Sequence, residues 1–260
     1  MFKILKYSFY DLIRSRWSFI YLMFYLLLGV VLLFLNSNIS NAIVTLLNVI
    51  TVLVPLIGTL FGVMYYYDSK EFTELLLAQP IKRSNIFLGQ YFGVAISLSI
   101  SLIIGLGLPF MYYGLFISDK IWEFLTLIIV GTFLTFIFTA ISFFIAISFE
   151  NKIKGFGVAI LVWLLLAVIY DGIFLIALVY FEQYPLDVFS LGAIMSNPID
   201  LSRVLMLLKL DISALLGYTG AVFKKFFGTN FGVILSYIIL IFWTIIPIIG
   251  IVWKSNKKDF

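Results

Sequence analysis

The sequence predicts an all-α, polytopic membrane protein with six transmembrane helices. Hydrophobic residues make up 63% of the chain, charged residues only 12%, and the mean hydropathy is +1.15. A globular domain normally carries about a quarter charged residues, so too few are present here to solvate a surface. Six stretches reach the roughly 20 apolar residues that a helix needs to cross a bilayer. They are 17–35, 42–67, 88–117, 122–149, 156–181 and 231–253.

The positive charges predict the orientation of these spans. Twelve of the 17 Lys and Arg residues fall in the N-terminal segment, in the loops 68–87 and 150–155, and in the C-terminal tail. Cytoplasmic segments of membrane proteins carry an excess of Lys and Arg. We therefore expect both termini to lie in the cytoplasm and the chain to reside in the inner (cytoplasmic) membrane. The net charge of +4 then reflects topology and does not indicate nucleic-acid binding.

Two missing residue types limit the chemistry of the chain. With no Cys and no His, it can build no zinc site of the usual kind and no Ser-His-Asp or Cys-His nucleophile. The sequence also lacks a GxxxxGK[ST] phosphate-binding loop. We expect a single transmembrane domain over 1–260 that is not an enzyme, binds no cofactor or metal itself and hydrolyses no ATP.

Two segments on the predicted cytoplasmic side have an amphipathic pattern. Residues 2–16 form an elbow helix in this prediction, with one apolar face and the charged residues opposite. Its apolar residues are Phe2, Leu5, Phe9, Leu12 and Ile13, and the charged ones are Lys3, Asp11 and Arg14. Such a helix either only anchors the chain at the membrane surface or also contacts a cytoplasmic partner.

The loop 68–87 predicts a second short helix, from about Ser69 to Ala78, which Pro80 ends. Phe72, Leu75 and Leu76 would form an apolar ridge on it. An exposed apolar ridge favours docking into a groove of another protein. The alternative is that the helix folds back on the membrane surface.

This loop carries a resemblance to a known family. The run from Glu71 to Tyr91, EFTELLLAQPIKRSNIFLGQY, follows the second of six spans and resembles the ABC-2 type ABC transporter permeases. The resemblance implies that the loop is the coupling helix, which seats in a cleft of a cytoplasmic ATP-binding subunit. It also implies a homodimer whose two partner subunits hold ATP and Mg. The coupling residues that the resemblance implies are Glu71, Glu74, Leu75, Gln79, Pro80 and Arg83. Phe72 and Leu76, the other two residues of the apolar ridge, complete the candidate set.

The segment 182–230 carries a second resemblance. The run from Asn197 to Leu205, NPIDLSRVL, is followed by KLD at 209–211 and LGYTG at 216–220. It is similar to the NosY type of ABC-2 permease, which serves maturation of the copper centre of nitrous oxide reductase. The resemblance implies an extracytoplasmic segment that meets a periplasmic copper-maturation protein through Asn197, Pro198, Asp200 and Arg203. The alternative is a structural hairpin that re-enters the membrane and plugs its outer side.

Small and polar residues recur on predicted helix faces within the membrane. The third span has one at every fourth position, a pattern that lets helix backbones approach closely. Packing against protein is the favoured interpretation, and a water-filled path is the alternative. The residues are Gly89, Gly93, Ser97, Ser101, Gly105 and Pro109 in the third span, Thr132, Thr135, Thr139 and Ser142 in the fourth, and Thr45, Asn48, Pro55, Gly58 and Gly62 in the second.

Asp171 is the only acid well inside a predicted span. A carboxylate there costs at least about 2.5–3.5 kcal/mol, so it should face a partner or a cavity or be protonated. No basic residue in the predicted spans can pair with it. Asp171 and Asn48 are therefore the candidates for an intramembrane path.

The sequence as a whole predicts a permease subunit that is driven by a separate ATPase. Two other functions remain open at this point. One is a generic ABC-2 exporter of a drug, lipid or glycan. The other is a membrane scaffold that transports nothing, which would have no ATPase partner.

Overall fold

The computed structural model describes residues 1–36, 38–181, 183, 186–210 and 220–257. Within these ranges the chain is helical and contains no strand, as the sequence predicts. Six helical segments are long and apolar enough to cross a membrane. They are α2 (Arg16–Leu35), α3 (Ile39–Asp68), α5 (Arg83–Tyr112), α6 (Ile121–Ser148), the segment Lys152–Tyr180, and α12 (Asn230–Lys257). The protein is thus a multi-pass, all-α membrane protein.

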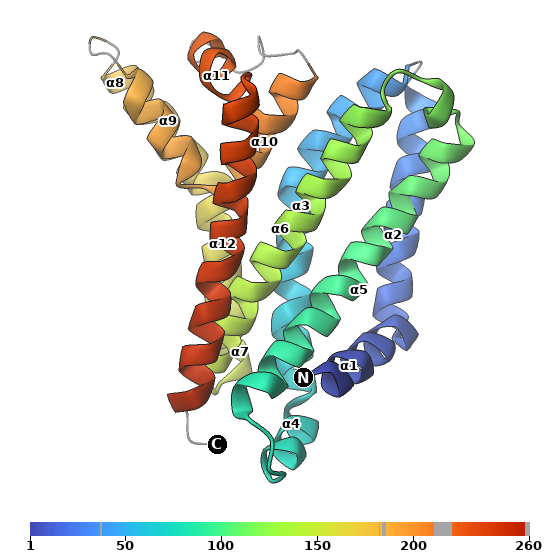
Figure 1. The fold of residues 1–260 in the computed structure, drawn as a ribbon, viewed down its shortest axis with the longest axis vertical. Helices are drawn as coiled ribbons and strands as arrows, with labels where there is room; N and C mark the ends of the chain where they lie inside the picture. The colour runs from blue at the N-terminus through green and yellow to red at the C-terminus, as the bar shows by residue number, and fades with distance from the viewer. Residues whose placement is uncertain (37, 182, 184–185, 211–219, 258–260) are drawn as a thin grey trace.

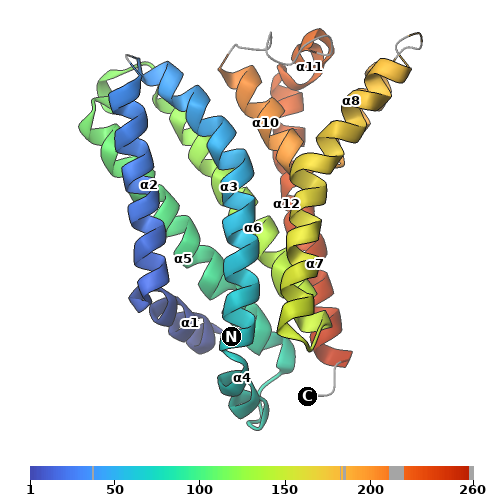
Figure 2. The same ribbon diagram turned by 180° about the vertical axis from the view of Figure 1, so that it is seen from behind.

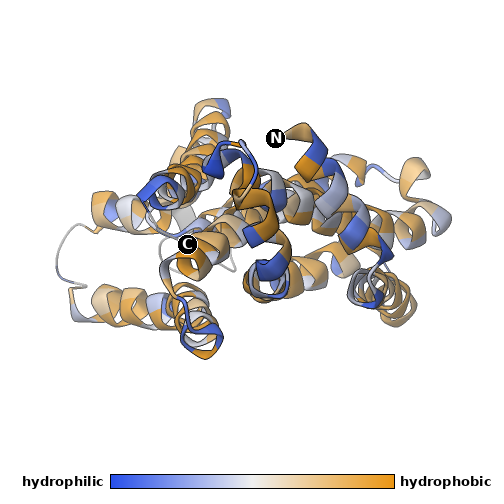
Figure 3. Ribbon diagram, turned by 90° about the horizontal axis from the view of Figure 1, so that it is seen from below, coloured by the Kyte–Doolittle hydropathy of each residue, from blue (hydrophilic) through white to orange (hydrophobic). Residues whose placement is uncertain are grey.

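The shorter elements lie at the two ends of this bundle. At one end are α1 (Phe2–Arg14), which lies across the foot of α2, and α4 (Lys70–Leu77); both chain ends lie there too (Figures 1 and 2). At the other end are the 3-10 helix η1 (Leu115–Ile117) and α11 (Gly220–Phe227). Seen from below, hydrophilic segments gather around the two termini (Figure 3). The arrangement fits an even number of crossings.

The third span ends earlier than predicted. Its helix stops at Tyr112 instead of running to 117, because Gly114 adopts a left-handed conformation with φ +97° that a helix cannot continue through. The helix begins at Arg83, five residues before the predicted start of the span at 88. The predicted helix in the 68–87 loop is present and runs from Lys70 to Leu77.

The fifth span is interrupted. It consists of α7 (Lys152–Leu164), a π-helical turn η2 (Leu165–Ile169) and α8 (Tyr170–Tyr180). After it, α9 (Asp187–Met195) and α10 (Pro198–Lys209) are bent by 113° relative to each other. This helix pair enters from the end opposite to the chain termini and turns back within the bundle (Figures 1 and 2). Most of α10 is buried, so this part of the predicted extracytoplasmic segment is a re-entrant hairpin.

The small-residue faces pack helices against each other. A Cβ added at Gly93 would lie 2.6 Å from the Cβ of Ser8, and one at Gly105 would lie 2.7 Å from the Cβ of Tyr25. The stripe on α5 therefore holds α1 and α2. Similarly, a Cβ at Gly58 of α3 would lie 3.3 Å from Oγ1 of Thr139 on α6. These contacts confirm the packing interpretation of both faces.

The apolar face predicted for the elbow helix is not a single buried surface. The buried residues of α1 are Ile4, Ser8 and Leu12, and they lie against α5. Phe2 is 82% exposed and Ile13 is 42% exposed. The apolar surface of this helix is thus divided: one part contacts protein, and the other faces outward, where hydrocarbon can cover it.

Candidate functional site

The short helix α4 is attached to the bundle by two side-chain contacts. Gln90, fully buried on α5, donates to the Thr73 hydroxyl at 2.8 Å and to the Ser69 hydroxyl at 3.3 Å. The Phe72 ring stacks on Tyr7 of α1, with ring centroids 4.5 Å apart. A single residue, Ser69, separates α4 from the end of α3. Movement of α4 must therefore act on α1, α3 and α5 together.

The outer surface of α4 combines one apolar residue with charged ones. Leu75 is 69% exposed, and Glu71 and Glu74 are exposed beside it. Lys70 and Glu74 form an exposed ion pair at 3.8 Å. Gln79, Pro80 and Arg83 are also exposed, whereas Leu76 is half-buried. The predicted ridge is therefore incomplete, because Phe72 packs against α1 and leaves Leu75 as its most exposed member.

The loop between α6 and α7 lies at the same end of the bundle as α4 (Figure 1). The sequence did not predict that this loop contacts α3. The hydroxyl of Tyr67 donates to the carbonyl oxygen of Phe149 at 2.9 Å, and Asp68 pairs with Lys152 at 2.7 Å. A Cβ on Gly155 would collide with the Tyr67 hydroxyl. The start of the fifth span is thus in direct contact with α3, the helix that leads into α4.

Replacing Gln90 by Leu is expected to loosen α4 without unfolding the bundle. The variant loses both hydrogen bonds to the α4 segment, a net cost of about 1–2 kcal/mol. Hydrogen exchange of the amides at 70–78 should become faster, while the thermal midpoint changes little. Ser99→Ala is the matched control, because the buried Ser99 hydroxyl bonds only to Ala95 of its own helix. Unchanged exchange in Gln90→Leu would show that α4 is held by other contacts.

A polar cluster lies where the fifth span meets the hairpin. Nη1 of Arg203 is 2.6 Å from Asp171 and 3.4 Å from Asp200. Asp171 therefore has a basic partner, although none of the predicted spans supplies it. Arg203 belongs to the segment 182–230, which was predicted to be extracytoplasmic because it lies between the fifth and sixth spans. Two features of the sequence pointed to this contact. The residues around Arg203 are apolar, and an acid within a span requires a cation nearby.

Asn197 joins this cluster to the interrupted part of the fifth span. Its amide nitrogen donates to the Leu166 carbonyl oxygen and to Asp200, both at 2.8 Å, and its oxygen accepts from the Ile199 amide at 3.0 Å. Leu166 lies in the π-helical turn, where the regular hydrogen-bond pattern changes. The Asn-Pro start of α10 therefore both caps that helix and satisfies a carbonyl group of the span.

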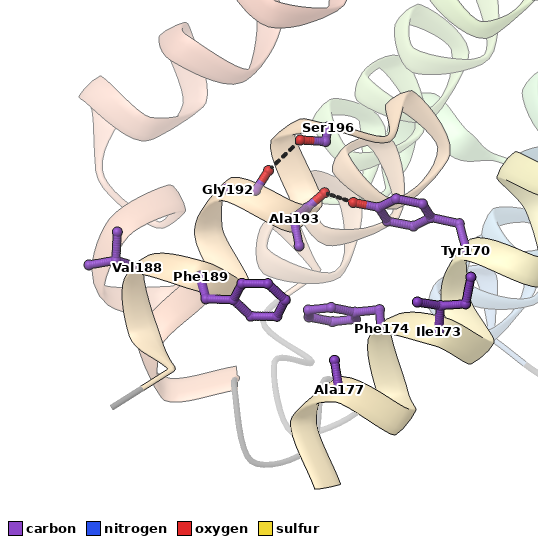
Figure 4. A pocket seen from close by; sticks show the side chains of 9 residues that line it. All are labelled: Tyr170, Ile173, Phe174, Ala177, Val188, Phe189, Gly192, Ala193 and Ser196. Carbon is purple, nitrogen blue, oxygen red and sulfur yellow. Dashed lines mark hydrogen bonds between the residues drawn. The ribbon is translucent and has the colours of Figure 1, made fainter. Parts of the chain in front are cut away.

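A crevice of about 410 Å³ separates α8 from α9 (Figure 4). Phe174 and Phe189 face each other across it with ring centroids 6.4 Å apart. The Tyr170 hydroxyl donates to the Ala193 carbonyl oxygen at 2.6 Å and closes one end. The lining is mainly apolar, so this crevice suits hydrocarbon rather than an ion.

The remaining predicted site residues are spread over the structure. Asn48 is exposed on α3, and its amide donates to Val44 of its own helix at 3.4 Å. Among the described residues, no hydrogen bond links Asn48 to the Asp171 cluster. Asn197, Pro198 and Asp200 are buried inside the chain. The last residue of the KLD motif, at 211, and the first four residues of the LGYTG motif, at 216–219, lie outside the described residues.

No protein-family model matches the chain. A comparison with characterised proteins finds similarity to the probable ABC transporter permease protein NosY of Stutzerimonas stutzeri. The two are 25% identical over 213 residues, which cover 76% of this chain and 77% of that protein. This match confirms the predicted resemblance to an ABC transporter permease. The chain is thus similar to an ABC transporter permease over about three quarters of its length, and it shares no more than a quarter of the aligned residues with it.

Proposed function

We propose that this chain is the permease of an ABC transporter in which α4 is the contact for a cytoplasmic ATP-binding subunit. The observation that carries the proposal is the geometry of α4. This helix projects at the end of the bundle where both termini lie, presents Leu75 with two acids, and is tied to three other helices. In this proposal both termini are cytoplasmic and the membrane is the inner membrane.

The contacts of α4 define how ATP-driven motion would enter the membrane. Closure of the ATP-binding subunits displaces α4, and the Gln90 hydrogen bonds pass that displacement to α5. The α5 stripe is packed tightly on α1 and α2, so these three helices move as one body. The Asp68–Lys152 pair carries the same displacement to the fifth span.

We propose further that two copies of the chain work as a homodimer with two ATP-binding subunits. The resemblance supports this, and so does the uneven burial of the spans. In the fifth span only 11% of the most apolar window is buried within the chain, against 67% in α5 and in α6. A span so little covered by its own chain leaves a long apolar face for lipid and for a second copy.

The finer proposal is that the transporter serves periplasmic maturation of the copper centre of nitrous oxide reductase. Its support is the similarity to NosY and the run from Asn197 to Arg203. Because the chain has no Cys and no His, a periplasmic partner protein would handle the copper. Because Asn197 and Asp200 are buried, their role in this proposal is to hold the hairpin in position beneath the surface that this partner contacts.

The test of the coupling contact is co-purification of this chain with a candidate ABC-type ATP-binding subunit from the same organism. Leu75→Asp places a charge on the exposed apolar residue of α4, and we expect loss of the complex and of ATP hydrolysis stimulated by this chain. Phe116→Asp is the control, because Phe116 is similarly exposed, at 65%, at the opposite end. An intact complex with Leu75→Asp would place the contact elsewhere.

The maturation role has its own readout. Deleting the gene for this chain should leave nitrous oxide reductase without its full copper content, and restoring wild type but not Leu75→Asp should repair it. Full copper loading without this chain would contradict the maturation role and favour export of another substrate, without affecting the coupling proposal.

A further inference from the structure

The helix α1 has three distinct faces. Ile4, Ser8 and Leu12 contact the bundle, and Phe2 and Ile13 form an exposed apolar strip. The third face borders a shallow hollow that is widely open to the outside and is lined by Lys3, Lys6, Tyr7, Tyr10 and Arg14. The helix thus carries an apolar strip and a cationic strip side by side on its outer surface.

We propose that the cationic face of α1 binds the phosphate of an anionic phospholipid. Three cations line this open hollow from one side, and Asp11, the only acid of this helix, is not among the lining residues. Two half-exposed tyrosines add hydroxyl donors, and Nζ of Lys6 lies 6.0 Å from the centroid of the Tyr10 ring. This is the chemistry that recognises a phosphodiester.

The neighbouring apolar strip distinguishes a lipid from a protein partner. Phe2 and Ile13 are on the same helix as the hollow, and they need hydrocarbon beside them. A phospholipid supplies both requirements, since its phosphate and its acyl chains lie at adjacent depths of one leaflet. An acidic protein surface would satisfy the cations but would leave the apolar strip in water.

The site is connected to α4. Tyr7 lines the hollow with one part of its ring surface accessible, and it stacks on Phe72 of α4. A phosphate held by Lys3 and Lys6 fixes Tyr7 and, through the stack, steadies α4. Lipid composition thereby regulates how firmly α4 is presented. Only this consequence rests on the proposed function; the binding site does not.

The experiment measures lipid retention by native mass spectrometry of the purified chain, with dioleoyl phosphatidylglycerol and dioleoyl phosphatidylcholine as probes. The variant is Lys3→Gln/Lys6→Gln/Arg14→Gln. The control is Lys70→Gln/Lys82→Gln/Lys154→Gln, which removes three exposed charges at the same end outside the hollow. We expect wild type to prefer phosphatidylglycerol, the variant to lose about tenfold or more of that affinity, and the control to change by less than about twofold.

Three outcomes would overturn the proposal. Equal retention of the two lipids by wild type would exclude a phosphate-charge site. Displacement of phosphatidylglycerol by excess inorganic phosphate would identify a free phosphate as the ligand. Unchanged lipid binding by the variant, combined with loss of its ATP-binding subunit, would assign the cationic face to a protein. A failure of the ATPase to bind wild type would leave the lipid result intact and affect only the proposed coupling.

Discussion

Substituting Ala for Gly105 is expected to destabilise the bundle by about 1–3 kcal/mol, because an added Cβ has no room between α5 and α2. The new atom would lie 2.7 Å from the Cβ of Tyr25 and 3.0 Å from the carbonyl oxygen of Leu22. Neither is the far end of a flexible side chain, so α2 itself would have to shift. Because the fully buried Tyr25 also accepts a hydrogen bond from Tyr21 at 3.0 Å, that shift disturbs a polar contact as well.

The matched control lies two residues away on the same helix. A Cβ on Gly107 would meet no atom within 4 Å. Ala is a better helix former than Gly by up to about 1 kcal/mol, so Gly107→Ala should be neutral or slightly stabilising. Thermal unfolding in one detergent compares the two variants directly. Equal loss of stability in both would show that the stripe on α5 does not depend on close contact with α2.

Much of this architecture follows from local sequence pattern. Apolar length predicted all six spans, and spacing by four predicted the faces on which Gly89 to Gly105 pack. These signals succeed because each depends on one helix alone. The end of α5 shows the limit: Gly114 interrupts an apolar run, and hydropathy averaged over the run does not register one left-handed residue.

The spacing of apolar residues in α1 could not predict that its apolar surface is divided between protein and the outside. Leu12 faces α5 while Phe2 and Ile13 face outward, yet all three are apolar and lie on the same half of the helix. In a membrane protein lipid and protein are equally apolar, so hydrophobicity does not distinguish them. The small residues of α5 were the informative signal, since a Gly-rich stripe demands a closely packed neighbour.

The Asp171 cluster required tertiary information. Asp171 and Arg203 are 32 residues apart and lie on different sides of the loop that begins after Tyr180. Its position between the fifth and sixth predicted spans placed Arg203 outside the membrane. Only the return of α10 into the bundle brings the guanidinium to the carboxylate. The contact could therefore be predicted only after the path of the hairpin was known.

The largest electrostatic effect is expected at Arg203. Replacing it by Gln leaves Asp171 and Asp200 close together with no cation between them, and we expect a loss of about 2–3 kcal/mol. Arg203 and Asp171 remain 26% and 31% exposed, which is why the expected loss is smaller than that for breaking a fully buried pair. Lys152→Gln is the control: it breaks a pair of similar length that is more than half exposed, and it should cost less than about 1 kcal/mol.

A double-mutant cycle separates the pair from its surroundings. Asp171→Asn/Arg203→Gln removes both charges of the 2.6 Å contact and should recover part of the loss, because the uncompensated carboxylate is gone. Arg203→Lys should recover less than full stability, since one Nη1 atom reaches both carboxylates and an ammonium on a flexible stem reproduces that position poorly. If the double variant were no more stable than Arg203→Gln, the guanidinium would act chiefly through Asp200 and the start of α10. The ion pair would then stabilise the hairpin itself and would not link it to the fifth span.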